Sequence, residues 1–305
     1  MANHTTATAP CIGAAESAAR ADGSSSFRAV AAEVFRRYGR NWKSSTAKVN
    51  RSCLRSQLLP RFEARSIATI SPADVQEWFA SLGRTPAAAN RALAVLSVIL
   101  EQAETYGLRP DGSNPCRGVR RYAERRCDRF LNDEEFRRLG AALRLAEVED
   151  PLAAALVRLL ILTGCRQSEI RTLRWRAYRE GHLHLADGKS GPRTVWLSSP
   201  ARRLLDGLPR NGPFAFPASR REGPMCTETL YRFWRPLRQA AGLPGLRLHD
   251  LRHSYASFAL RRGEAVPTIG RLLGHRDPTT TLRYTHLDDG AVREAAALVG
   301  SSLAG

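Results

Sequence analysis

Six side chains in the second half of the 305-residue chain have types suited to chemistry on a phosphate. They are Arg166, Lys189, His249, Arg252, His275 and Tyr284. Arginine offers parallel N–H donors that match phosphate oxygens. Histidine donates hydrogen bonds or moves protons, and lysine can give up a proton as arginine cannot. A tyrosine hydroxyl, with a pKa of about 10, becomes a nucleophile at neutral pH only with help from nearby cations.

The local context of these residues favours function over packing. Arg166 follows a Gly-Cys turn after an apolar stretch that predicts a buried helix, so its backbone is held rigidly. His249 and Arg252 are three positions apart and project from one side of a helix. Gly274, just before His275, permits the left-handed geometry of a helix end.

Tyr284 and Lys189 have unusual neighbourhoods in the sequence. Tyr284 is flanked by threonines and charged residues, whereas a core tyrosine has apolar neighbours. Lys189 is the only lysine after residue 48 in a chain with 47 basic residues, nearly all of them arginine. A lysine retained against that background indicates a role that needs a transferable proton.

Five motifs carry a resemblance to a known family. They are Thr163-Gly164-Cys165-Arg166 with the following Gln167–Trp175, Asp187–Arg193, His249-Asp250-Leu251-Arg252-His253, Leu273-Gly274-His275 and Arg283-Tyr284-Thr285-His286. The chain resembles the tyrosine recombinase (phage integrase) family, strongly in its catalytic half and more loosely over 27–125.

The resemblance implies a site-specific recombinase that cleaves and rejoins double-stranded DNA through a 3′-phosphotyrosyl intermediate. Arg166, Arg252, His249 and His275 would bind the phosphate, Tyr284 would attack it, and Lys189 would protonate the leaving oxygen. Neither metal, ATP nor another cofactor is implied. The resemblance also implies a homotetramer on paired sites, an accessory DNA-bending or directionality protein as a further partner, and DNA contacts by Lys43, Arg51 and Arg91.

The pattern of apolar residues predicts a mainly α fold with a small antiparallel sheet in two domains. A disordered leader over 1–26 precedes an all-α core-binding domain over 27–107, with helices at 27–40, 44–58, 71–82 and 85–106. Residues 108–130, rich in glycine, proline and charge, are predicted to be a linker.

Residues 131–305 form the predicted catalytic domain, an α+β unit. Residues 151–162 predict a buried helix, and 182–185 with 193–197 predict a hairpin around Asp187-Gly188, with Lys189 at its turn. Further helices are expected at 199–207, 227–241, 249–262 and 265–273, then a short one before Tyr284 and an amphipathic one at 288–299.

Composition agrees with a nucleic-acid partner. Forty-seven basic against 29 acidic residues give a net charge of +18, which attracts polyanions. Six cysteines without a C-x-x-C pair indicate reduced thiols, and no apolar run approaches ~18 residues, so we expect a cytoplasmic, nucleoid-associated protein without a membrane span.

Four alternatives remain open from sequence. His249 and His253 have the spacing of a two-histidine zinc helix, although Asp250 replaces the usual glutamate and Arg252 adds a positive charge. The chain is also compatible with a catalytically silent DNA-binding protein or a type IB topoisomerase. Within the recombinases, a resident Xer-like resolvase is the alternative to a phage or mobile-element integrase.

Overall fold

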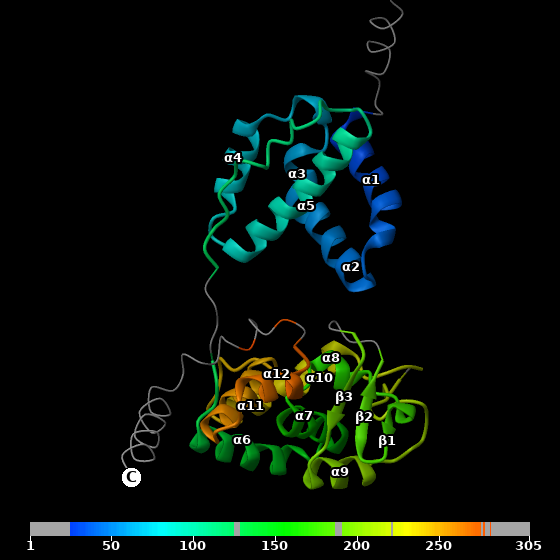
Figure 1. Ribbon diagram of the computed structural model, residues 1–305, viewed down its shortest axis with the longest axis vertical. Coiled ribbons are helices and arrows are strands. Elements are labelled where there is room, and N and C mark those ends of the chain that lie inside the picture. Colours follow the sequence, from blue (N-terminus) through cyan, green and yellow to red (C-terminus); the bar gives the residue numbers. More distant parts are fainter. Residues whose placement is uncertain are drawn as a thin grey trace, which may run out of the picture. The chain divides into compact units, whose positions relative to one another are not determined.

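The computed structural model describes residues 25–124, 129–186, 191–220 and 222–275, together with Asp277 and Thr281. The chain divides into two compact units between Arg126 and Cys127, each with its own hydrophobic core (Figure 1). The predicted leader (except Ser25 and Ser26), Lys189, Tyr284 and the helix at 288–299 lie outside the described residues.

The first unit is helical throughout its described part. It comprises α1 (Phe27–Arg37), a 3-10 turn (Tyr38–Asn41), α2 (Ser44–Cys53), a π turn (Leu54–Leu58), α3 (Leu59–Phe62), a second 3-10 turn (Ile67–Thr69), α4 (Pro72–Ser81) and α5 (Pro86–Thr105). The predicted helix over 44–58 therefore continues to Phe62. Pro60 cannot donate a backbone hydrogen bond, and the widened π turn before it accommodates the missing donor.

Aromatic packing and capping stabilise this unit. The Phe62 ring lies 5.6 Å from that of Phe27 and 5.5 Å from that of Trp78, so α1, α3 and α4 share one core. Ser71 and Asp74 form a reciprocal capping box at the start of α4, as the Ser-Pro sequence indicates. The all-α prediction for this region is confirmed.

Residues 108–124 pack against the first unit, although the sequence predicts them as linker. The Arg109 guanidinium is buried and donates to the carbonyl of Ile70 at 3.1 Å. Asn90 exchanges two hydrogen bonds with the backbone of Tyr122, at 2.9 and 3.0 Å. Because these contacts satisfy buried polar groups, the segment is part of the unit rather than a free connection.

The second unit is mainly helical with a three-stranded sheet. Its elements are α6 (Asp133–Ala146), α7 (Pro151–Thr163), α8 (Gln167–Arg171), a 3-10 turn (Trp175–Ala177), β1 (Tyr178–Arg179), β2 (His182–Leu185), β3 (Arg193–Trp196), α9 (Ser199–Asp206), α10 (Thr227–Ala240), α11 (Asp250–Arg261) and α12 (Val266–Leu273). Helix α7 is almost wholly buried and packs against α6, α8, α9 and α11. The predicted fold class is confirmed.

The sheet is antiparallel in the order β1-β2-β3, at one side of the helices (Figure 1). Leu183 pairs with Val195, and both side chains are buried. The hairpin of β2 and β3 was predicted, whereas two-residue β1 is too short to give an alternating pattern. Among the described residues, no helix has the length and apolar character needed to cross a membrane.

Candidate active site

Two helices of the second unit end at glycines whose backbones are left-handed. Gly164 ends α7 with φ of 60°, and Gly274 ends α12 with φ of 67°. A Cβ atom on Gly164 would lie 2.6 Å from Cδ1 of Tyr255, and one on Gly274 would lie 2.2 Å from Cδ of Arg193. Only glycine meets both the backbone and the space requirement at these positions.

Arg252, on α11, links these two helix ends. Its side chain is buried, and it donates from Nη1 to the Gly164 carbonyl at 2.9 Å and from Nη2 to the Leu273 carbonyl at 2.8 Å. Carbonyls at helix C-termini carry partial negative charge, which favours a cation there. Burial, and then the charges of Arg166 and Arg193, lower the Arg252 pKa to about 10, so it remains a cation at neutral pH.

Arg166 precedes α8 and is anchored by Glu169. Its Nη1 donates to Glu169 Oε1 at 3.0 Å, and its backbone N–H donates to Oε2 at 2.8 Å. Arg193, at the start of β3, donates to the same Oε2 at 2.8 Å. Burial raises the pKa of Glu169, but the hydrogen bond from Arg193 and its charge lower it below the usual value, so the carboxylate is ionised.

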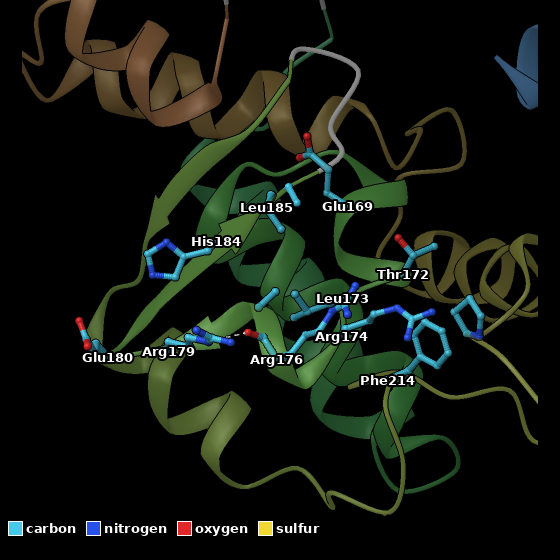
Figure 2. Close-up of a pocket in the computed structure, with 13 residues that line it drawn as sticks. Glu169, Thr172, Leu173, Arg174, Arg176, Arg179, Glu180, His184, Leu185 and Phe214 are labelled. Carbon is cyan, nitrogen blue, oxygen red and sulfur yellow. Dashed lines mark hydrogen bonds between the residues drawn. The ribbon is translucent and has the colours of Figure 1, made fainter. Parts of the chain in front are cut away.

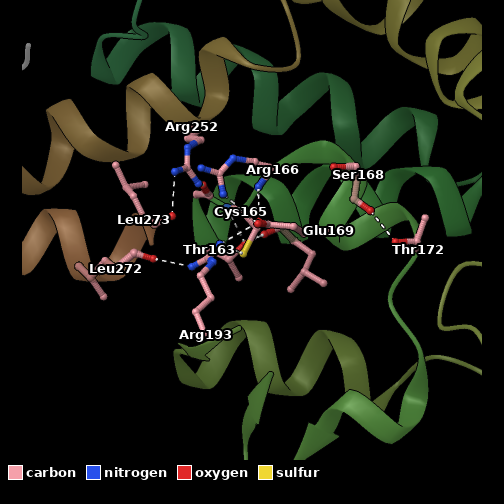
Figure 3. A network of polar contacts seen from close by, with 12 residues as sticks. Thr163, Cys165, Arg166, Ser168, Glu169, Thr172, Arg193, Arg252, Leu272 and Leu273 are labelled. Atoms are coloured by element: carbon pink, nitrogen blue, oxygen red, sulfur yellow. Dashed lines mark hydrogen bonds and ion pairs between the residues drawn. The ribbon is translucent and has the colours of Figure 1, made fainter. Parts of the chain in front are cut away.

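Figure 3 shows Arg166, Arg252, Glu169 and Arg193 gathered around Cys165. Two guanidinium groups bind the Glu169 carboxylate and that of Arg252 lies near it, which leaves a local excess of positive charge. Such a cluster suits an anionic ligand, because fixed N–H donors and positive charge both favour it.

His249 precedes Arg252 by one helical turn, at the N-cap of α11. It is exposed, and its ring lies edge-on to that of His253 at 4.9 Å between centroids. Loss of hydration, and then the charges of His253 and Arg252, lower the His249 pKa to about 4. The imidazole is therefore neutral at neutral pH and is a weaker base than an ordinary histidine.

His275 is fixed directly after the Gly274 turn. Its backbone N–H donates to the Gly270 carbonyl at 2.9 Å, and its Nδ1 lies 2.8 Å from Oγ1 of Thr281. Arg252 holds the Leu273 carbonyl two residues earlier, so the same helix end positions both groups.

Four of the six predicted site residues lie in the described part of the chain. Arg166 and Arg252 come together (Figure 3). His249 is at the start of α11, which carries Arg252, and His275 follows α12, whose last carbonyl Arg252 contacts. Sequence reasoning did not assign roles to Glu169 or Arg193. The sequence held a signal for Arg193. It is two and four positions before the buried Val195 and Leu197, so it lies on the same, inward face of the strand.

A cavity of about 950 Å³ borders this cluster, with Glu169 at its edge (Figure 2). Its wall includes Arg174, Arg176, Arg179 and His184, all exposed. The Arg174 guanidinium stacks over the Phe214 ring at 4.5 Å. Glu180 also lines the cavity, so its three arginines exceed its two carboxylates by one, and basic side chains extend beyond the predicted residues.

A zinc site finds no support in the ligand set. His249 and His253 are adjacent, but the described residues contain no group of three or more His, Cys, Asp or Glu side chains placed to hold a metal ion. A structural zinc ion takes four protein ligands and a catalytic one takes three.

In the first unit, Lys43, Arg51 and Arg91 are all exposed. Helices α2 and α5 contact each other. Burial raises the pKa of the Cys53 thiol at the end of α2, and the charge of Arg91 on α5 partly offsets that rise. None of the three cations forms an ion pair with a described residue, whereas Arg61 and Arg65 of the same unit pair with acids. The three are therefore available to an external anion.

The sequence pattern of the Phage integrase family matches residues 129–290, more than half of the chain. The chain belongs to the phage integrase family. A second pattern, described as the phage integrase N-terminal SAM-like domain, matches residues 26–83.

Two kinds of relative resemble this phage integrase family member. Tyrosine recombinase XerD of Brucella suis is 37% identical over 146 residues, which covers 44% of this chain and 47% of XerD. A putative prophage phiRv2 integrase of Mycobacterium tuberculosis is 27% identical over 298 residues, covering 87% of this chain and 77% of that protein. The chain thus spans about half the length of XerD and most of the prophage integrase.

Solved integrase structures share the fold at low identity. A lambda integrase tetramer bound to a Holliday junction matches with a TM-score of 0.71 at 18% identity, covering 90% of this chain and 81% of the other. A Tn1549 transposon integrase in complex with transposon right end DNA matches with a TM-score of 0.70 at 16% identity, covering 92% and 100%. This phage integrase family member therefore has an integrase fold across both units.

Proposed function

We propose that this protein is a site-specific DNA recombinase that cuts and rejoins DNA through a covalent bond between Tyr284 and a 3′-phosphate. The convergence of Arg166 and Arg252, from elements far apart in sequence, carries the proposal (Figure 3). Two preorganised guanidinium groups can stabilise the charge that develops on the phosphate oxygens during attack.

The reaction divides into two steps in this proposal. The Tyr284 hydroxyl oxygen attacks phosphorus, the bond to the 5′-oxygen breaks, and Lys189 gives its proton to that oxygen. The bound phosphate anion raises the proton affinity of His249, which takes the proton of the tyrosine, while His275 donates to the phosphate. The 5′-hydroxyl of a partner strand then attacks the phosphotyrosyl bond and releases Tyr284. Because each ester is replaced by another, ATP is not required, and in this proposal the guanidinium groups supply the positive charge that a metal would otherwise bring.

The substrate we propose is double-stranded DNA, in the cytoplasm and on the nucleoid. The DNA-bound lambda and Tn1549 integrase structures support this partner, and the lambda tetramer on a Holliday junction supports four copies acting together. Lys43, Arg51 and Arg91 would contact phosphates from the first unit. An accessory DNA-bending or directionality protein completes the proposed assembly.

We favour a phage or mobile-element integrase over a resident Xer-like resolvase. The prophage integrase aligns over 298 residues, including the first unit, whereas the XerD match covers 146 residues. The resolvase stays as the second candidate because XerD has the higher identity over the shorter region.

Covalent trapping tests the proposal. Purified protein is mixed, in EDTA, with nicked duplexes tiled from DNA that flanks its gene and from the chromosome terminus, then denatured and resolved on a gel. We expect an adduct that Tyr284→Phe abolishes and that Tyr231→Phe, at an exposed position on α10, retains. An adduct on flanking DNA supports the mobile-element role, and one only on the terminus supports the resolvase. Salt-sensitive binding without any adduct would support the catalytically silent alternative.

A further inference from the structure

Three arginines lie around Glu169. Arg252 is the most enclosed of them, and Arg193 is the next. Its side chain is 9% exposed, against 21% for Arg166, while the Glu169 side chain is 5% exposed. Glu169 is therefore a buried carboxylate with one inner and one outer cation. The outer one, Arg166, has the accessible surface that a ligand can reach.

The contacts of Arg193 hold its charge in place. Nη1 donates to the Leu272 carbonyl at 3.0 Å, and Nη2 donates to Glu169 at 2.8 Å and contacts the Cys165 sulfur at 3.5 Å. Gly274 leaves the space that its Cδ and Nε atoms occupy. Figure 3 shows its side chain approaching Glu169 from the opposite side to Arg166.

We propose that Arg193 is a positioning residue that balances the charge of Glu169, so that the guanidinium of Arg166 keeps its charge available for the scissile phosphate. The inference deepens the proposed function and rests on it for the identity of the phosphate. A buried carboxylate needs a paired cation. If Arg166 alone met that need, the carboxylate would neutralise the cation meant for DNA.

The charges of the cluster make this inference testable. With Arg166, Arg193 and Arg252 around Glu169, the cluster has a net charge of about +2. Arg193→Gln lowers it to about +1, and adding Glu169→Gln returns it to about +2. Removing the carboxylate should therefore rescue the loss of Arg193, which a purely structural role for Arg193 would not produce.

The test measures single-turnover adduct formation on a nicked duplex for the wild type, Arg193→Gln, Arg193→Lys and the double variant Arg193→Gln/Glu169→Gln. Removing one charge from a preorganised site lowers the rate roughly 10²-fold, so we expect that loss for Arg193→Gln. Arg193→Lys, which keeps the charge although it loses the planar fork, and the double variant should both react at least about tenfold faster than Arg193→Gln. Arg203→Gln, exposed on α9, is the matched control and should leave the rate unchanged.

Thermal unfolding of each variant separates folding from positioning. If Arg193→Gln alone is too unstable to assay, Arg193→Lys and the double variant still decide the question. A double variant as slow as Arg193→Gln, or slower, overturns the inference, as does a slow Arg193→Lys with wild-type stability.

A readout without DNA keeps this inference separate from the recombinase proposal. Inorganic phosphate that binds the cluster raises the unfolding temperature relative to chloride at equal ionic strength. We expect this shift to shrink in Arg193→Gln and return in the double variant. That pattern without a wild-type DNA adduct would refute the recombinase and retain the charge balance. A wild-type DNA adduct without rescue in either assay would refute the charge balance and retain the recombinase.

Discussion

Arg252 donates a hydrogen bond of 2.9 Å to the carbonyl of Gly164, a residue 88 positions earlier in the chain. The bond joins the C-terminal end of α7, from which Arg166 follows, to α11, which also carries His249. A second bond from Arg252 reaches Leu273 at the end of α12, just before His275. One buried guanidinium therefore sets the relative positions of three helices that bear the candidate site.

Arg252→Lys should damage both stability and reaction. A lysine ammonium lacks the planar fork, so at least one buried carbonyl loses its donor, at a cost of about 1–3 kcal/mol. We expect that decrease in the free energy of unfolding from guanidinium titrations, and a roughly 10²–10³-fold slower adduct formation. Arg261→Lys, exposed on the same helix, should change stability by less than about 0.5 kcal/mol. Equal effects of the two substitutions would refute the linking role of Arg252.

Gly274→Ala should be more destabilising than Gly263→Ala. Both glycines have positive φ, of 67° and 81°, so each alanine incurs a backbone penalty of about 1 kcal/mol. At Gly274 the new methyl would also meet Arg193 at 2.2 Å, whereas nothing lies within 4 Å at Gly263. The clash should add about 1–3 kcal/mol, measured as the difference between the two variants in denaturant unfolding. Adduct formation should slow only in Gly274→Ala, because only there does Arg193 move.

The depressed pKa of His249 predicts an acid sensitivity of folding. The unfolded histidine takes up a proton near pH 6.5, but the folded one does so only near pH 4. The unfolded state therefore binds more protons between these values, and stability falls as the pH is lowered through that window. Since His249 is exposed, solvent screening limits the loss to on the order of 1 kcal/mol.

Urea titrations between pH 4 and 7 measure this effect. The slope of unfolding free energy against pH should be shallower in His249→Asn than in the wild type. An identical slope in His249→Asn would show that the surroundings do not lower the pKa of His249 in the folded state.

Metal removal should leave the reaction unchanged. Arg252 lies between His249 and His253 in sequence, and the described residues offer this pair no third ligand. We expect equal adduct yields in EDTA and in added zinc, and a His253→Gln variant that still forms adduct. Loss of activity in EDTA with recovery on zinc would restore the metal-site alternative.

Lys43, Arg51 and Arg91, which form no ion pair with a described residue, should account for part of the salt dependence of DNA binding. Removing a cation that neutralises one phosphate reduces the slope of log affinity against log salt by about 1. We expect that reduction for Lys43→Gln, Arg51→Gln and Arg91→Gln in fluorescence anisotropy titrations. Arg61→Gln removes an arginine whose charge is paired with Glu77 and should leave the slope nearly unchanged. A common reduction in all four variants would indicate general charge attraction.

The predicted helices agree best with the structure where local chemistry fixes an element. The Ser71-Pro72 start of α4 and the apolar run of α7 are both confirmed, as is the left-handed glycine before His275. Each depends on neighbours within a few positions. The linker predicted over 108–130 also rested on local composition, but the packing of 108–124 does not, because it depends on Arg109 and Asn90 reaching distant backbone groups.

By itself, the sequence determined the helical fold class, the residue types suited to phosphate chemistry and the motifs that resemble the phage integrase family, since all of these are encoded in local composition and spacing. Only the tertiary structure decided that Arg193 and Glu169 belong with Arg166 and Arg252. Their partnership depends on a strand, two helix ends and a buried carboxylate meeting in space. No spacing along the chain encodes the burial that makes a lone carboxylate costly and a second cation necessary.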